Sequence, residues 1–356
     1  MSRLIRARVD SDALRANLSS IRAQAPASRV MAVVKANAYG HGLLATASAL
    51  SNADAFAVAR LDEAITLREA GLTRRIVLLE GVLDAQQLAQ AAQHSLDLVV
   101  HQELQIALLQ AYRGPQRFAL WLKVDTGMNR LGFRPREFAL AWQRLSALKP
   151  AQLRVMTHLA CADEADGAAT AEQLARLAPL VAQLDVELSI ANSAAILAQP
   201  KTHAAWVRPG LALYGVSPFE GRLGTQLGLR PAMTLQSTVI ALRELERGER
   251  AGYGGRWQAT RASRLAIIAA GYGDGLLRSL PCGAPVWIGS QRAPLAGRVS
   301  MDMIAVDITD LPPVAVGDPV EIWGPHLPVE ELARAAQTIP YELLCAVSQR
   351  VPIELV

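Results

Sequence analysis

Between residues 29 and about 215, short apolar runs rich in β-branched residues alternate with longer stretches rich in Ala, Leu, Arg, Glu and Gln. Continuous apolar runs are typical of strands buried on both faces of a parallel sheet, and the longer stretches are typical of the helices that cover it. The pattern predicts strands at residues 30–34, 55–59, 76–79, 96–100, 118–124, 153–157, 186–190 and 206–207. It predicts helices at residues 11–25, 41–50, 61–70, 85–93, 102–111, 137–147, 168–184 and 193–197.

This succession of strands favours one closed barrel. Eight parallel strands within about 200 residues are typical of a (β/α)8 TIM-type barrel. A doubly wound open sheet is the main alternative, but no GxGxxG sequence opens a first helix. We therefore expect an α/β chain with an N-terminal (β/α)8 barrel.

The pattern changes after about residue 230. Predicted strands at 233–242, 265–270, 284–288, 303–308 and 320–323 are separated by turns rich in Gly, Pro and Asp, and only 328–337 and 341–347 have helical patterns. This predicts a mostly β C-terminal domain at residues 231–356, after a barrel at residues 1–230. The segment 3–9 also has a strand pattern and can pair with the second domain, so the boundary need not be a single cut.

Composition excludes several classes of protein. Hydrophobic residues make up 51% of the 356 residues, which suits a packed core, and a net charge of +4 is too small to indicate a nucleic-acid partner. No apolar stretch approaches the roughly 18 residues of a membrane span, and the N-terminus lacks the apolar region of a secretory signal. Three widely spaced cysteines fit reduced thiols. We expect a cytoplasmic protein with no membrane partner.

Reactive side chains follow the predicted barrel strands. Barrel enzymes place their chemistry at the carboxyl ends of the strands. The residues at these ends are Lys35, Arg130, Arg208, His158 and Ser193. Their side chains provide an amine, two guanidinium groups, an imidazole and a hydroxyl. We expect these groups to converge on one face of the barrel.

Lys35 is the central candidate, because the chain has only four lysines, at 35, 123, 149 and 201. It follows the apolar strand 30–34, so it is partly desolvated, and desolvation favours the neutral amine. A neutral amine is the nucleophile that forms a Schiff base. The alternative is a lysine at a strand end that points into solvent.

Ser193 and Gly210 follow the last two strands, where barrels often bind phosphate. The alternative for Ser193 is a helix cap. A phosphate cofactor that bears an aldehyde and lies between this site and Lys35 would be pyridoxal 5′-phosphate. Arg208 is then a candidate partner of the ring nitrogen, and because arginine stays protonated, that nitrogen would remain unprotonated. The alternative for Arg208 is a structural ion pair.

Three further segments of the second domain carry candidate residues. Tyr253 lies between glycines in AGYGG, Tyr272 in GYGDG, and Met301 with Asp302 in GRVSMDM. Flanking glycines allow the backbone to come close to a ligand and leave the tyrosine tip exposed. The alternative is a turn tyrosine that packs at an interface for Tyr253, and a loop between two strands for Met301 and Asp302. The six histidines have no HxxxH or HxH spacing, so we expect no catalytic metal.

These segments together resemble the alanine racemases, pyridoxal-phosphate enzymes that interconvert L- and D-alanine. The resemblance rests on AVVKANAYGHG at 32–42, KVDTGMNRLG at 123–132, THLACAD at 157–163, NSAA at 192–195, RPGLALYG at 208–215, GYGG at 252–255, GYGDG at 271–275 and GRVSMDM at 297–303. It covers both domains in order. It implies the same fold and a head-to-tail homodimer, in which each active site combines one subunit's barrel with the partner's second domain.

The resemblance also implies roles for single residues. Lys35 is expected to hold the cofactor as a Schiff base and to act as the base on one face of the substrate Cα, with Tyr253 of the partner subunit as the base on the other face. Racemisation needs two such bases, because the proton leaves one face and returns on the other. The remaining cofactor-binding positions implied by the family are Tyr39, His158, Ser193, Arg208, Gly210 and Tyr341.

Arg130 and Met301 match positions that bind the substrate carboxylate, and Asp302 and Tyr272 are expected to support the site. Lys123 matches a lysine that is carbamylated in many family members. As an anion it would orient Arg130.

The implied function is racemisation of alanine, which supplies D-alanine for peptidoglycan or breaks it down. A broad-specificity amino-acid racemase is the alternative within the same class. A non-catalytic pyridoxal-phosphate carrier would resemble the barrel alone, and a D-amino-acid lyase would need a metal cluster in the second domain.

Overall fold

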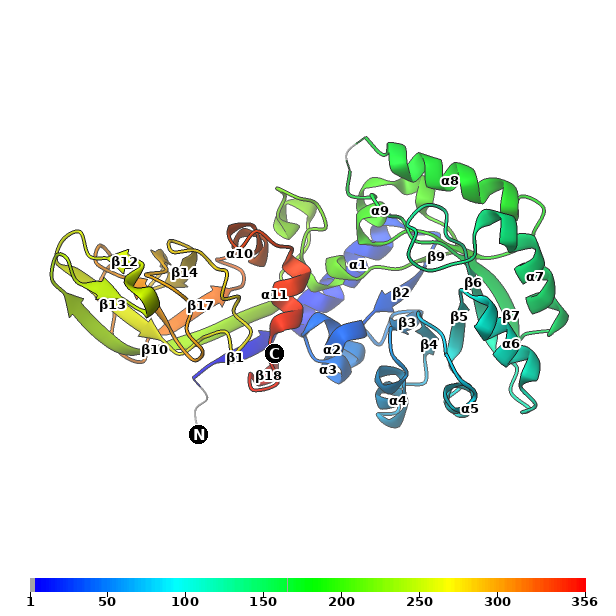
Figure 1. Ribbon diagram of the computed structural model, residues 1–356, viewed down its shortest axis with the longest axis horizontal. Coiled ribbons are helices and arrows are strands. Elements are labelled where there is room, and N and C mark those ends of the chain that lie inside the picture. The colour runs from blue at the N-terminus through cyan, green and yellow to red at the C-terminus, as the bar shows by residue number, and fades with distance from the viewer. Residues whose placement is uncertain (1–3, 165) are drawn as a thin grey trace.

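The computed structural model describes residues 4–164 and 166–356. A barrel forms one end of the elongated molecule and a mostly β domain forms the other, with α11 (Pro340–Ala346) lying between them (Figure 1). Arg3, the first residue of the predicted strand 3–9, lies outside the described residues. No helix of the described residues is both long and apolar enough to cross a bilayer.

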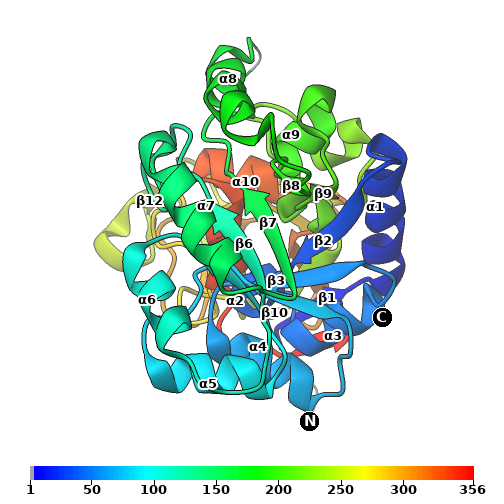
Figure 2. The same ribbon diagram turned by 90° about the vertical axis from the view of Figure 1, so that its right-hand side faces the viewer.

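The barrel is closed by parallel strands that follow one another in sequence order, and the last pairs with the first (Figure 2). This confirms the predicted (β/α)8 fold. The barrel's strands are β2 (Arg29–Val33), β3 (Ala55–Val58), β4 (Arg75–Leu78), β5 (Asp97–Val100), β6 (Ala119–Lys123), β7 (Gln152–Met156), β8 (Leu188–Ser189) and β9 (Trp206–Val207).

Helices surround the barrel strands (Figure 2). They are α1 (Ser11–Gln24), α3 (Leu43–Ala49), α4 (Leu61–Glu69), α5 (Ala85–Gln93), α6 (Glu103–Ala111), α7 (Phe138–Ala147), α8 (Ala168–Val181) and α9 (Ser193–Ala198). Their bounds lie within three residues of the predicted ones. The Asp10 side chain caps α1 by accepting from the backbone N–H of Ala13 at 2.9 Å, as side-chain oxygens do at helix starts.

A left-handed turn between β2 and α3 was not predicted. The segment α2 (Lys35–Tyr39) has φ angles of 54°, 52°, 55° and 52° at its last four residues, none of them glycine. This conformation costs roughly 1–2 kcal/mol for each such residue, because Cβ approaches the following carbonyl. The turn ends at Gly40, where a Cβ would overlap the Leu344 carbonyl oxygen, so only glycine fits.

The second domain is built around the long strand β10 (Met233–Leu245), which pairs with strands on both sides along its length. Four short or polar strands had no clear apolar pattern and were missed. Two of them, β15 (Gln291–Pro294) and β18 (Ile353–Leu355), lie at the edges of the main sheet, and β11 (Arg250–Ala251) and β12 (Trp257–Gln258) form a separate two-stranded sheet. The other elements are β13 (Ser263–Ile268), β14 (Pro285–Ile288), β16 (Ile304–Asp307), β17 (Pro319–Trp323) and α10 (Val329–Ala335).

The two ends of the chain meet in this second sheet. The first strand, β1 (Arg6–Val9), pairs antiparallel with β10 and parallel with β18 before the chain enters the barrel (Figure 1). Two separate crossings of the chain therefore connect the domains.

A buried asparagine on α1 forms hydrogen bonds with the segment that follows the last barrel strand. The Asn17 side chain is 1% exposed, and its amide donates to the carbonyl oxygens of Leu213 at 3.0 Å and Arg230 at 2.8 Å. Its carbonyl oxygen accepts from the backbone N–H of Arg230 at 2.8 Å. The side chain therefore satisfies three backbone groups at the junction.

We expect Asn17→Ala to lower the free energy of unfolding by about 2–4 kcal/mol, because buried backbone groups lose their partners. Chemical denaturation followed by circular dichroism measures the change. Ser19→Ala, at an exposed position of the same helix, is the control and should change stability by less than about 0.5 kcal/mol. Equal stability of the two variants would contradict this role of Asn17.

Candidate functional site

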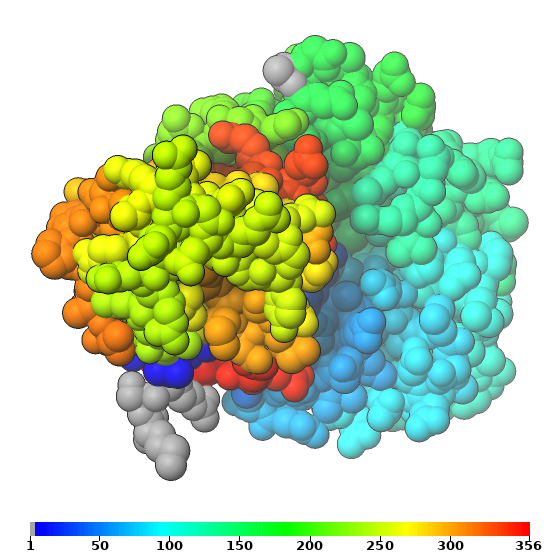
Figure 3. Space-filling view, turned by 60° about the vertical axis from the view of Figure 1, so that its left-hand side comes forward, coloured from blue at the N-terminus to red at the C-terminus, as the bar shows by residue number. Residues whose placement is uncertain are grey.

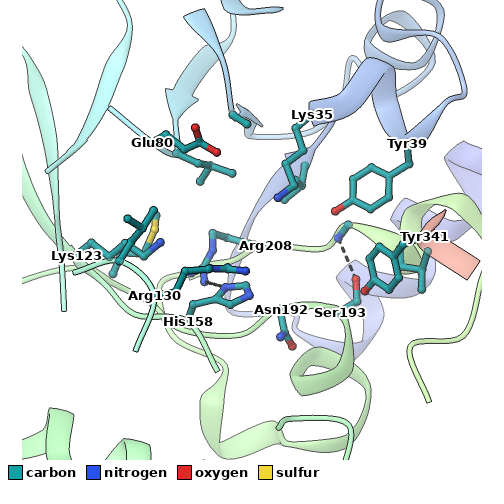
Figure 4. Close-up of a pocket in the computed structure, with 17 residues that line it drawn as sticks. Lys35, Tyr39, Glu80, Lys123, Arg130, His158, Asn192, Ser193, Arg208 and Tyr341 are labelled. Atoms are coloured by element: carbon teal, nitrogen blue, oxygen red, sulfur yellow. Dashed lines mark hydrogen bonds between the residues drawn. The ribbon is translucent and has the colours of Figure 1, made fainter. Parts of the chain in front are cut away.

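A cavity of about 380 Å³ opens at the carboxyl ends of the barrel strands (Figure 4). All the site residues predicted in the barrel line it. Lys35 follows β2, Lys123 ends β6, His158 follows β7 and Arg208 follows β9. The remaining predicted residues that line it are Tyr39, Arg130, Ser193 and Gly210 from the barrel and Tyr341 from the second domain.

Hydroxyl groups gather at one end of the cavity. The Ser193 hydroxyl oxygen accepts from the backbone N–H groups of Gly210 at 2.9 Å and Ala212 at 3.2 Å, so its own proton remains available to a ligand. Asn192, rather than Ser193, caps α9, because its side chain accepts from Ala195 N–H at 3.1 Å. The alternative of Ser193 as a cap is therefore wrong.

Tyr39 brings a phenol to the same end. Its ring stacks on Tyr214 with centroids 4.8 Å apart and tilts against Tyr341 at 5.8 Å. A Cβ at Gly210 would overlap the Tyr39 hydroxyl, which explains a glycine there. Burial raises the pKa of Tyr39 above its ordinary value and that of Tyr341 to about 12. Both phenols therefore remain hydrogen-bond donors at neutral pH.

Arg208 lines the cavity and is buried, with 5% of its surface exposed. It donates to Ser189 Oγ and to the Thr157 carbonyl oxygen, each at 2.7 Å. No ion pair among the described residues involves Arg208, so the alternative of a structural ion pair is wrong. Burial lowers its pKa to about 10, which leaves the guanidinium protonated near neutral pH.

The charge on Arg208 also determines the state of His158. Arg208 Nη2 lies 3.2 Å from His158 Nδ1 and can only donate, so Nδ1 accepts and a neutral ring carries its proton on Nε2. Burial is the largest cause that lowers the pKa of His158 well below its ordinary value, and Arg208 is the next. The imidazole is therefore neutral.

Positive charge exceeds negative charge in the cavity. Burial is the largest cause that lowers the pKa of Lys123 to about 8, and the nearby cations lower it further. Among the described residues that line the cavity, Glu80 is the one carboxylate beside four cationic side chains, those of Lys35, Lys123, Arg130 and Arg208. Such a cavity suits ligands with phosphate or carboxylate groups.

Glu80 and Asn192 line the cavity but were not among the predicted site residues. Glu80 follows β4, at the same edge as the predicted residues, so the rule that barrel sites lie at strand ends could have found it. Asn192 adjoins Ser193 in the NSAA segment.

Apart from Tyr341, the candidate residues of the second domain lie outside this cavity. Tyr253, Met301 and Tyr272 are 70%, 52% and 40% exposed. Figure 3 shows the second domain, in yellow and orange, projecting away from the barrel with a hollow between them. Within one chain, the structure therefore does not bring these residues to Lys35.

A salt bridge holds the loop of Met301 and Asp302. Arg350 donates to Asp302 Oδ1 at 2.7 Å and forms an ion pair with Asp274, in which Nε lies 2.9 Å from Oδ1. Gly273 N–H donates to the Met301 carbonyl oxygen at 2.8 Å, so the loop also contacts the turn of Tyr272. Within the described part of the chain, no group of three or more His, Cys, Asp or Glu side chains could hold a metal ion.

The closed barrel, the cationic cavity at its strand ends and the appended β domain define an enzyme of the (β/α)8-barrel class. Residues 9–218 match the family described as "Alanine racemase, N-terminal domain", and residues 232–355 match "Alanine racemase, C-terminal domain". The chain belongs to the alanine racemase family.

Relatives and solved structures agree over the full length. An alanine racemase of Chromohalobacter salexigens is 51% identical over 99% of this chain and 98% of its own. The structure of a biosynthetic alanine racemase from Pseudomonas aeruginosa has a TM-score of 0.96 and 45% identity, over 100% of both chains. Another, from Bartonella henselae with covalently bound pyridoxal phosphate, has a TM-score of 0.90 and 31% identity, over 100% of this chain and 99% of its own.

The predicted family and activity are confirmed by these matches. The chain is an enzyme that racemises alanine, and the alternative of a broad-specificity racemase is not favoured.

The lowered pKa of Lys123 gives a pH-dependent prediction for protein freed of bound small molecules in carbonate-free buffer. In the unfolded chain this lysine has a pKa of about 10.4, so it binds its proton more tightly there than in the folded protein. The free energy of unfolding is therefore lowered in full below pH 8, and this effect is lost as the pH rises from 8 to about 10. We expect Lys123→Met to raise the free energy of unfolding by about 2 kcal/mol at pH 7 and by progressively less as the pH rises from 8 to 10.

Denaturant titrations at pH 7 and pH 10 measure this difference. The control is Lys201→Met, which changes an exposed lysine and should have little effect at either pH. A stability gain of the same size at both pH values would show that the buried charge on Lys123 is not its cause.

Proposed function

We propose that this enzyme racemises alanine by a two-base mechanism on pyridoxal 5′-phosphate linked to Lys35 Nζ. The observation that carries the proposal is a single cavity in which Lys35 lies between a cluster of hydroxyl donors and a buried, protonated Arg208. When bound, the cofactor supplies an aldehyde carbon for the lysine and an electron-withdrawing ring. The covalently bound cofactor named for the Bartonella henselae structure supports this assignment.

The cavity fits both ends of such a cofactor. The hydroxyl groups of Tyr39, Ser193 and Tyr341 would hold the phosphate, and the absent side chain of Gly210 leaves room for it. Arg208 would face the ring nitrogen. Because burial lowers its pKa only to about 10, it stays protonated and the ring nitrogen remains unprotonated.

Two residues move the proton of the substrate Cα. Lys35 Nζ accepts or returns it on one face, and the Oη of Tyr253 of the partner subunit does so on the other. Two features support a homodimer with composite sites: Tyr253 lies outside its own chain's cavity, and it is 70% exposed between glycines. His158 supports the site through the hydrogen bond between its Nδ1 and Arg208.

Arg130 would bind the substrate carboxylate from the barrel side, and Met301 of the partner subunit from the other. Lys123, whose pKa is lowered to about 8, is partly a neutral amine at neutral to mildly alkaline pH, which is the form that reacts with CO2. As a carbamate it would be an anion that orients Arg130. Asp302 would support the loop through Arg350, and Tyr272 would support it through the adjoining turn.

We further propose that the enzyme is cytoplasmic and supplies D-alanine for peptidoglycan, as the name of the biosynthetic Pseudomonas aeruginosa relative suggests. The free thiols of Cys161, Cys282 and Cys345 support a reducing compartment. We place the domain boundary at residue 230, with β1 contributed to the second domain's sheet.

Lys35→Ala should abolish the absorbance of the lysine-linked cofactor and lower racemisation of alanine by at least about 10³-fold, because the nucleophile and one base are lost together. Absorbance of the purified protein and a coupled alanine assay measure these effects. Lys201→Ala, at an exposed position, is the control. A Lys35→Ala protein that keeps the covalent chromophore would disprove the assignment.

A mixed-dimer experiment tests the composite site. Lys35→Ala and Tyr253→Phe chains should each be nearly inactive alone, but a heterodimer contains one site with both intact residues. Random 1:1 reassociation should therefore restore about a quarter of the wild-type rate, since half the dimers are mixed and each has one complete site. No recovery in a sample that native mass spectrometry shows to contain the mixed dimer would show that Tyr253 does not act across the dimer.

Turnover should be highest with alanine. The measurement compares kcat/KM for alanine, serine, lysine and arginine, and we expect alanine to exceed the two basic amino acids by at least about 10²-fold. Comparable values for alanine and lysine would instead support the broad-specificity alternative.

A further inference from the structure

We propose that Glu63 is a positioning residue for Lys35, acting through the backbone of the left-handed turn α2. Glu63 Oε1 accepts from the backbone N–H of Ala36, directly after Lys35, at 2.6 Å. Its Oε2 accepts from the N–H groups of Ala59 and Arg60, each at 3.1 Å. One carboxylate therefore joins the start of α2 to the end of β3. This inference rests on the proposed role of Lys35.

The turn needs such a partner because its backbone is unfavourable. Four successive non-glycine residues, 36 to 39, have positive φ angles, which normally occur singly and at glycine. Strained backbone persists only where its surroundings determine it. A carboxylate hydrogen bond to a backbone N–H is stronger than a neutral one, and Glu63 provides it at the first of these residues.

The turn determines where two cavity side chains point. Lys35 precedes its first left-handed residue and Tyr39 is its last, and both line the cavity (Figure 4). The far end is held by neutral groups: Asn37 Oδ1 accepts from Leu43 N–H at 2.8 Å, and His41 Nδ1 donates to the Tyr39 carbonyl oxygen at 2.9 Å. At the end of the turn next to Lys35, the hydrogen bond to the backbone therefore comes from a carboxylate, that of Glu63.

Glu63 is not among the residues that line the cavity. It therefore acts on Lys35 through the Ala36 peptide rather than by contact with substrate or cofactor. A change at Glu63 should alter the rate of the step that uses Lys35 Nζ more than the binding of the alanine carboxylate, for which Arg130 is proposed.

The test compares Glu63→Gln and Glu63→Ala with Asp62→Asn. Glu63→Gln keeps the size of the side chain and one carbonyl oxygen, but it places an NH2 group against backbone N–H donors. Glu63→Ala removes all three hydrogen bonds. Asp62 is the exposed neighbouring carboxylate in the same first turn of α4, so its variant controls for loss of charge at the helix start. Three quantities are measured: amide hydrogen exchange of segment 34–43, absorbance of the lysine-linked cofactor, and kcat and KM for alanine.

We expect exchange of segment 34–43 to become about tenfold faster in Glu63→Gln and faster still in Glu63→Ala, as loss of a charged hydrogen bond implies. Exchange in α7 should stay unchanged. The kcat should fall about tenfold in Glu63→Gln with KM changed less than about threefold, and the cofactor absorbance should shift or weaken. Asp62→Asn should match the wild type in all three quantities.

Wild-type exchange and kcat in Glu63→Ala would overturn the proposal. Faster exchange with unchanged kcat and absorbance would also overturn it, because the turn would then be loosened without effect on Lys35. The exchange measurement is repeated after removal of the cofactor with hydroxylamine, so its result does not depend on the role of Lys35. Lys35→Ala tests that role separately.

Discussion

Closure of the barrel is the constraint on which the rest of the site depends. Because all strands are parallel, their carboxyl ends form one ring, and the residues that follow them must face a common cavity. Lys35, Lys123 and Arg208 are brought together in this way, although like charges repel. Two features reduce this repulsion. Carbonyl and hydroxyl oxygens accept hydrogen bonds from the buried Arg208, and the pKa of Lys123 is lowered to about 8. The remaining positive charge favours anionic ligands.

A second constraint is the direction of the chain as it leaves the first barrel strand. Shortly after β2, at Lys35, the backbone reverses into the left-handed turn. Contacts from α4, α3 and the second domain hold this turn. Gly40 packs against the Leu344 carbonyl of α11, so the turn also touches an element from the end of the chain. The position of the lysine therefore depends on contacts far along the sequence.

The barrel and most barrel residues of the site could be predicted from the sequence, since apolar runs mark buried strands and the site lies where those strands end. The resemblance to the family predicted Tyr39, within the lysine motif, and Tyr341, by its position alone; no local pattern indicates that either lies at the cavity. The left-handed turn could not be predicted, because Ala36 and Ala38 carry no preference for positive φ. Short edge strands such as β11 and β18 were missed because pairing with β12 and β1, not apolar content, determines them.

The proposed two-base reaction accounts for how the candidate groups are divided between the two domains. In the proposed mechanism Lys35, which follows a barrel strand, serves one face of the substrate, and the base proposed for the other face, Tyr253, lies on the second domain. The second domain offers an exposed tyrosine, Tyr253, on a glycine-flanked turn, and this tyrosine does not line its own barrel's cavity. A second copy of the chain can bring that tyrosine to the cavity, and symmetry then completes two sites at once. The proposed dimer would in this way supply the second base of the proposed mechanism.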